Sequence, residues 1–85
     1  MLPEVICEAY AESGVQNRVT EQDDMVVIAG TRESLLFLSR LLAAQEESPD
    51  DGFGISPFGA GRAWFAAGST KGIYPRRTNT PLMGK

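Results

Sequence analysis

The fold is decided by residues 25–47, whose sequence is MVVIAGTRESLLFLSRLLAAQEE. Residues 25–29 form an unbroken apolar run with two valines and an isoleucine. Such a run is typical of a short strand that is buried on both faces, so we expect it at the centre of a sheet. Gly30 ends this strand, and Thr31 predicts a helix N-cap with Glu33 in the first turn, where its charge favours the helix dipole.

The predicted helix runs from about residue 31 to residue 47, because Pro49 prevents further extension. At 100° per residue one face of this helix is apolar and should pack on the sheet. Leu36 is the exception, because it falls on the polar side between Ala43 and Arg40. It either covers a loop or contacts another chain. The apolar face consists of Leu35, Phe37, Leu38, Leu41 and Leu42.

Further strands are predicted on both sides of this unit. Residues 4–12 alternate with a two-residue period, which indicates a strand, and residues 15–20 indicate a second one. Residues 53–55 and 72–74 predict short strands, whereas residues 63–66 form either a strand or the wall of a loop. The fold class is therefore α+β, an antiparallel sheet of about four to five strands with one amphipathic helix, about 31–47, packed on one face. The expected core is Val5, Cys7, Val27, Ile28, Leu35, Leu38, Leu42, Ile55 and Ile73, with Phe37, Leu41 and Trp64 at least partly buried.

The length of 85 residues suits one domain and is too short for two. We assign residues 1–75 to a single α+β domain and residues 76–85, which lack periodicity, to an exposed or disordered basic tail. The single cysteine, Cys7, excludes a disulfide within the chain and favours a reducing, cytoplasmic location. We see no signal-peptide pattern and no apolar run of the roughly 20 residues that span a bilayer, so we expect no membrane association.

Catalytic and metal-binding patterns are missing from the sequence. The chain has no histidine, which removes the commonest general base and the commonest metal ligand. The glycines of residues 52–72 complete neither a dinucleotide motif nor a phosphate loop, and they predict hairpins and loops instead. We therefore expect a non-enzymatic protein with no metal and no cofactor.

The charge is divided along the chain. All 11 acidic residues lie in residues 1–52, which carry a net charge of −8, whereas residues 53–85 carry +5. The two halves either pack together and neutralise each other or meet a charged partner. The basic half, with Trp64 and Tyr74 for stacking on bases, suggests the alternative of a small nucleic-acid-binding protein. The strongly acidic first half makes nucleic acid the less favoured partner.

The strand, turn and helix of residues 26–42, VVIAGTRESLLFLSRLL, resemble those of small bacterial immunity proteins from polymorphic toxin systems. Residues 68–74, GSTKGIY, are similar in placement to the closing strand of those proteins. The resemblance implies a cytoplasmic inhibitor that neutralises a toxin by binding it. Family members often carry a histidine in the strand after the helix, and residues 53–56 contain none, so we transfer no functional residue.

The function that we predict is a non-catalytic protein-binding domain, of which a toxin-neutralising protein is one form. An acidic surface and an exposed leucine suit a basic or partly apolar protein partner, or a second copy of the chain in a homodimer formed through Leu36 or an edge strand. The candidate partner-binding residues are Leu36, Arg40, Arg62, Lys71, Arg76 and Arg77.

Overall fold

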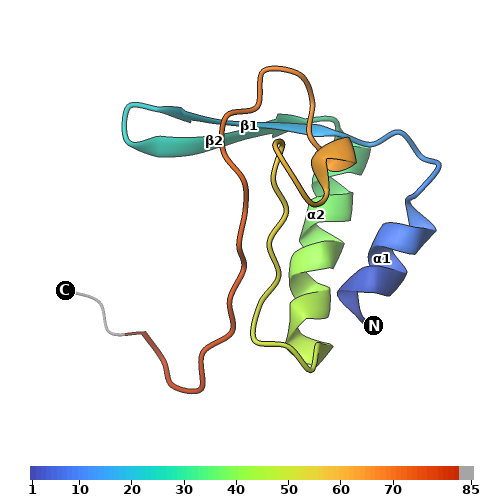
Figure 1. Ribbon diagram of the computed structural model, residues 1–85, viewed down its shortest axis with the longest axis vertical. Coiled ribbons are helices and arrows are strands. Elements are labelled where there is room, and N and C mark those ends of the chain that lie inside the picture. The colour runs from blue at the N-terminus through green and yellow to red at the C-terminus, as the bar shows by residue number, and fades with distance from the viewer. Residues whose placement is uncertain (83–85) are drawn as a thin grey trace.

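The computed structural model describes residues 1–82 and contains two α-helices and one two-stranded antiparallel sheet (Figure 1). In chain order the elements are α1 (Pro3–Ala9), β1 (Asn17–Gln22), β2 (Met25–Gly30), α2 (Arg32–Ala44) and two short 3-10 helices, η1 (Gln45–Glu47) and η2 (Arg62–Trp64). The α+β class is confirmed. The sheet of four to five strands is wrong, because only β1 and β2 form a ladder within residues 1–82.

The predicted strand at residues 4–12 is instead the helix α1. Pro3 occupies its first turn and Glu4 adds a favourable charge there. Ile6 and Tyr10, four residues apart, are buried, whereas Val5 of the predicted inward face is exposed. A helix of seven residues is not stable alone. Its packing on α2 therefore outweighs the two-residue alternation of the sequence.

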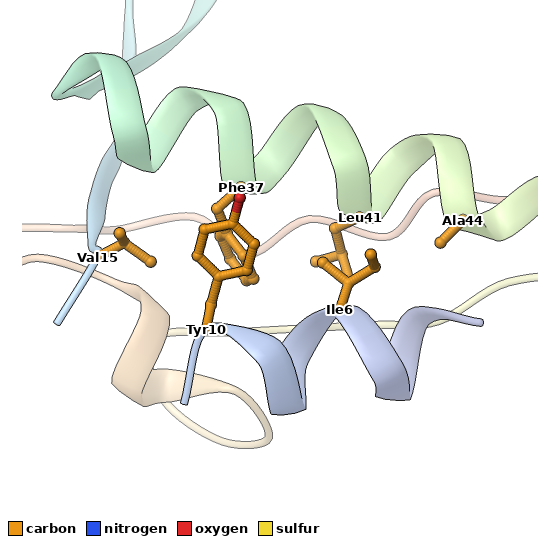
Figure 2. Packing of buried hydrophobic residues seen from close by; sticks show 6 residues of the cluster. All are labelled: Ile6, Tyr10, Val15, Phe37, Leu41 and Ala44. Atoms are coloured by element: carbon orange, nitrogen blue, oxygen red, sulfur yellow. The ribbon is translucent and has the colours of Figure 1, made fainter. Parts of the chain in front are cut away.

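The core lies between the two helices. Phe37 of α2 is 1% exposed, and its ring lies 5.1 Å from that of Tyr10 and 4.6 Å from that of Trp64. Figure 2 shows the side chains of α1 and α2 pointing toward one another across this contact. The buried cluster consists of Ile6, Tyr10, Val15, Phe37, Leu41 and Ala44, with Cys7, Phe53, Ile55 and Trp64 packed against it.

The helix predicted at residues 31–47 is confirmed in its position. The Thr31 hydroxyl accepts a hydrogen bond from the Ser34 amide at 3.1 Å, as its N-cap role requires. The α-helix ends at Ala44, and η1 continues helical structure to Glu47. The predicted apolar face is only partly buried, because Phe37, Leu38 and Leu41 are covered while Leu35 and Leu42 remain exposed.

The last third of the chain packs along α2 and β1 as extended segments with few bridges. Ile55 pairs with Ile73, and Gly52 pairs with Arg76, each as an isolated antiparallel bridge. The strands predicted at residues 53–55 and 72–74 are therefore single bridges, and residues 62–64 form η2. Ile55 and Ile73 are half-buried. Arg76, expected in the tail, lies in the bridge with Gly52, where the Pro75 carbonyl accepts from the Phe53 amide and the Arg77 amide donates to the Asp51 carbonyl.

Candidate protein interface

The hairpin of β1 and β2 sets the geometry of the most exposed apolar segment. Asp23 and Asp24 both have a positive φ, of 51° and 64°, which is the geometry of a two-residue type I′ turn. Gln22 pairs with Met25 across that turn, and the register continues to Asn17 opposite Gly30. The residues that flank such a turn form a hydrogen-bonded pair, and bonded and non-bonded pairs then alternate along the ladder.

This alternation determines which backbone groups point away from the hairpin. The non-bonded pairs join Glu21 to Val26, Val19 to Ile28 and Asn17 to Gly30. The amide and carbonyl groups of these residues are therefore directed to the outer edges of β1 and β2.

On the β1 side, outward groups of Asn17 and Val19 are hydrogen-bonded by the C-terminal third of the chain. The Asn17 carbonyl accepts from the Ala66 amide at 2.8 Å, and the Val19 carbonyl accepts from the Thr70 amide at 2.8 Å. The Val19 amide donates to the Ser69 hydroxyl at 3.1 Å. The edge of β1 is thus covered at Asn17 and Val19, and this pattern supports the alternation inferred from the turn.

The edge of β2 has no such cover. Within residues 1–82, no backbone group outside the hairpin bonds to Val26, Ile28 or Gly30. In Figure 1 the hairpin extends beyond the two helices, with its turn at the outer end. The prediction that residues 25–29 form a central strand is therefore wrong, because β2 is an open edge strand.

Exposed apolar side chains occur on both faces of β2 and on the following helix. Val26 is 62% and Met25 is 61% exposed, and Ile28, predicted in the core, is exposed as well. We call this set the β2–α2 surface, after the two consecutive elements that supply it. It consists of Met25, Val26 and Ile28 of β2 and Leu35 and Leu36 of α2.

Gly30 and Asn17 hold β2 and α2 in this arrangement. Asn17 is buried, and its side-chain amide donates to the Ser34 carbonyl at 3.0 Å. The space that a Cβ atom would occupy at Gly30 is filled by Asn17 Oδ1 and Ser34 Oγ. A residue with a side chain at position 30 would push the strand away from the helix.

The predicted site residues do not form one cluster of free charges. Leu36 is exposed, as predicted. Arg40 donates to the Tyr10 hydroxyl at 2.9 Å, with its guanidinium 6.0 Å from the ring centre, so it covers the core. Lys71 lies 3.8 Å from the Glu21 carboxylate in an exposed ion pair. Arg62 and Arg76 are exposed, and within residues 1–82 neither forms a salt bridge.

Arg77 has a structural role that the sequence does not reveal. Its Nη1 lies 3.1 Å from the Gln45 carbonyl and 2.9 Å from the carbonyls of Glu46 and Ser48. These carbonyls lie in and just after η1, where helix-end carbonyls lack partners within the helix. The Arg77 guanidinium, 29 to 32 residues further along the chain than these carbonyls, thus caps the helical segment that follows α2. The second residue of the predicted tail, residues 76–85, is therefore anchored to the domain. Met83, Gly84 and Lys85 lie outside the described residues.

A second surface feature is an apolar groove of about 490 Å³ between α1 and residues 53–55. Cys7 lies in it, and burial raises the pKa of the Cys7 thiol, while the Glu4 carboxylate raises that pKa further. A raised pKa keeps the thiol neutral and makes it a poor nucleophile at neutral pH. The groove offers space for an apolar side chain.

Within residues 1–82, no three His, Cys, Asp or Glu side chains gather closely enough to hold a metal ion. Across the same residues, the helices are too short or too polar to cross a membrane. Comparison with protein families, with curated proteins and with solved structures finds no match to this chain.

The exposed apolar residues of β2 were missed by the sequence reading, which placed them in the core. One signal favours the observed arrangement: the run of residues 25–29 lies between a two-residue acidic turn and a helix N-cap, so its only sequence neighbour in the sheet is β1. Whether another strand covers its far side depends on contacts distant in sequence, which local patterns do not encode.

Proposed function

We propose that this chain is a non-catalytic protein-binding domain whose interface is the β2–α2 surface. The observation that carries the proposal is the open edge of β2, where outward backbone groups and apolar side chains occur together. An exposed apolar edge strand is a ready template for pairing with another chain. Proteins normally protect such an edge with charges, proline or a bulge, and residues 25–30 contain no charge and no proline.

The distribution of charge supports a protein partner over a nucleic acid. Basic side chains that would contact phosphates are partly used inside the molecule: Arg77 caps a helix end and Lys71 faces Glu21. Arg62 and Arg76 remain exposed, but two arginines give a small electrostatic contribution compared with the six to ten phosphate contacts of typical DNA-binding proteins. We therefore keep nucleic-acid binding as the alternative that the experiments should exclude.

A toxin-neutralising role is one form of this proposal, and its support is the sequence resemblance of residues 26–42. An immunity protein acts by occupying a toxin surface and needs no catalytic group of its own. The cytoplasm is the location that we propose, from the single unpaired cysteine. The partner would then be a protein that reaches the same compartment.

The test is affinity capture of the tagged chain from its native host after nuclease treatment. We expect one stoichiometric protein partner for the parent chain and its loss in Val26→Lys, which places a charge on the open edge. The matched control is Phe58→Lys, which changes an exposed aromatic residue outside the β2–α2 surface. Equal capture by both variants, or capture of nucleic acid only, would refute the proposed interface.

A further inference from the structure

The open edge of β2 has a geometry that selects one partner. We propose that two copies of this chain associate through their β2 edges, antiparallel and related by a two-fold axis at Ile28. This inference rests on the proposed function, because it uses the same surface, and it adds the identity of the partner and the register of pairing.

The register follows from the outward groups of β2. Only Val26, Ile28 and Gly30 direct their amide and carbonyl groups to the free edge. When Ile28 faces Ile28 of the second copy, Val26 faces Gly30 and Gly30 faces Val26. All outward groups of the three residues are then paired. A shift of the axis by one residue, to Val27, pairs Val26 with Ile28 and leaves Gly30 opposite the turn.

The charges at the two ends of β2 are complementary in this register. The acidic turn residue Asp24 precedes β2, and its end of β2 would lie near the point where Arg32 begins the second copy's α2. The N-terminus of that thirteen-residue helix adds a partial positive charge. Parallel pairing would instead set Asp24 beside Asp24. Glu33 follows Arg32 and partly offsets its charge, so the hydrogen-bonded edge provides most of the affinity and the charges select the orientation.

The small size of the domain gives a reason for such pairing. The buried cluster of six residues is centred on the contact between α1 and α2, and the β2 strand of the hairpin keeps apolar residues exposed to water. Pairing two hairpins makes a four-stranded sheet, which is more stable than an isolated two-stranded one. A small domain that buries little of its surface commonly gains stability from oligomerisation.

The first test is sedimentation equilibrium of the full chain over a wide concentration range. We expect a reversible monomer–dimer equilibrium. Val26→Pro removes an outward amide without taking a bond from β1, so it should weaken the dimer by about ten-fold or more. Val26→Thr keeps both the amide and the branched shape, and it should dimerise like the parent chain. A parent chain that stays monomeric throughout, or a Val26→Pro variant that dimerises equally well, would overturn the inference.

The second test fixes the register and does not depend on any variant. In the proposed dimer Val27 and Ala29 of different copies form a non-bonded pair with their Hα atoms in contact. A sample that mixes isotope-labelled and unlabelled chains should therefore show an intermolecular Hα–Hα Overhauser effect between Val27 and Ala29. An effect between Val27 and Val27 would indicate the shifted register and contradict the axis at Ile28.

The two proposals fail in distinguishable ways. A monomeric chain that still captures another protein, and loses it in Val26→Lys, would refute the dimer and leave the protein-binding function standing. A dimer that forms through other residues, with the β2 edge amides still exchanging freely, would refute the paired edge, and the proposed interface would fail as well only if Val26→Lys still captured the protein partner.

Discussion

Two apolar segments of this chain, β2 and the middle of α2, differ sharply in what the fold does with them. Phe37 and Leu41 of α2 are almost fully buried against α1, whereas Val26 of β2 is 62% exposed. Both segments look equally suited to a core in the sequence. The fold of a single chain buries the apolar residues in the middle of α2, which explains their presence. It leaves the apolar residues of β2 exposed, so their presence needs another explanation.

The largest effect should come from placing a charge on the buried side of α2. Leu38→Asp would bury a carboxylate with no partner, which costs several kcal/mol. This cost exceeds the net free energy of unfolding of a domain of this size. We expect loss of cooperative unfolding, measured by circular dichroism on heating.

The matched control for that variant is Leu36→Asp on the same helix. Leu36 is 44% exposed, so its carboxylate stays in water and the melting transition should remain cooperative. If both variants melt like the parent chain, the division of α2 into a buried and an exposed face is wrong.

The next largest effect on stability should come from a substitution at Gly30, where β2 meets α2. In Gly30→Ala the new methyl group would collide with Asn17 Oδ1 and Ser34 Oγ, and we expect a loss of about 1–3 kcal/mol in the free energy of unfolding. Gly59→Ala is the control, because a Cβ atom there meets nothing within 4 Å. Urea titration of both variants measures the difference, and equal midpoints would contradict the close packing at Gly30.

The helical segment that follows α2 should respond to loss of the Arg77 cap. Arg77→Met keeps much of the side-chain length and removes the donors to three carbonyls, so we expect a loss of about 1–2 kcal/mol. Arg76→Met, one position earlier and exposed, should change the stability by less than about 0.5 kcal/mol. Denaturant unfolding compares them, and a larger effect at Arg76 would exclude the capping role.

The smallest effect on stability should come from Cys7, which packs against the buried cluster. Burial and then Glu4 raise the pKa of its thiol above the usual value of 9.0, so the folded chain holds the proton to higher pH than the unfolded chain does. The resulting stability is present below pH 9.0 and is lost as the pH rises through the folded pKa.

Cys7→Ala should therefore remove part of the decline in stability above pH 9.0. Thermal melts of both proteins between neutral and alkaline pH measure that decline. Identical alkaline slopes would show that the environment of the thiol does not differ between the folded and unfolded chains.

The sequence was sufficient where local patterns determine the structure. The cap at Thr31, the helix that follows and the strand at residues 25–29 all depend on residues close together in the chain. It was misleading at residues 4–12, because a two-residue alternation and a four-residue spacing of Ile6 and Tyr10 coexist there. The packing of Ile6 and Tyr10 against α2, which is distant in sequence, stabilises the helix over the strand.

The candidate site was predicted only in part for the same reason. Leu36 could be identified as exposed because its helix has a clear polar face. The openness of β2 and the capping role of Arg77 depend on where residues 66–77 pack, which no local pattern specifies. The β2–α2 surface therefore emerged from the structure, and the charge split along the chain gave no indication of it.

The most direct test of the interface is hydrogen exchange at neighbouring amides of β2. The Val27 and Ala29 amides bond to β1 and should exchange slowly under all conditions. The Val26, Ile28 and Gly30 amides should exchange fast in dilute solution and become slow at high protein concentration or with a captured partner. Fast exchange at these three amides in every condition would contradict the claim that the β2 edge is a binding surface.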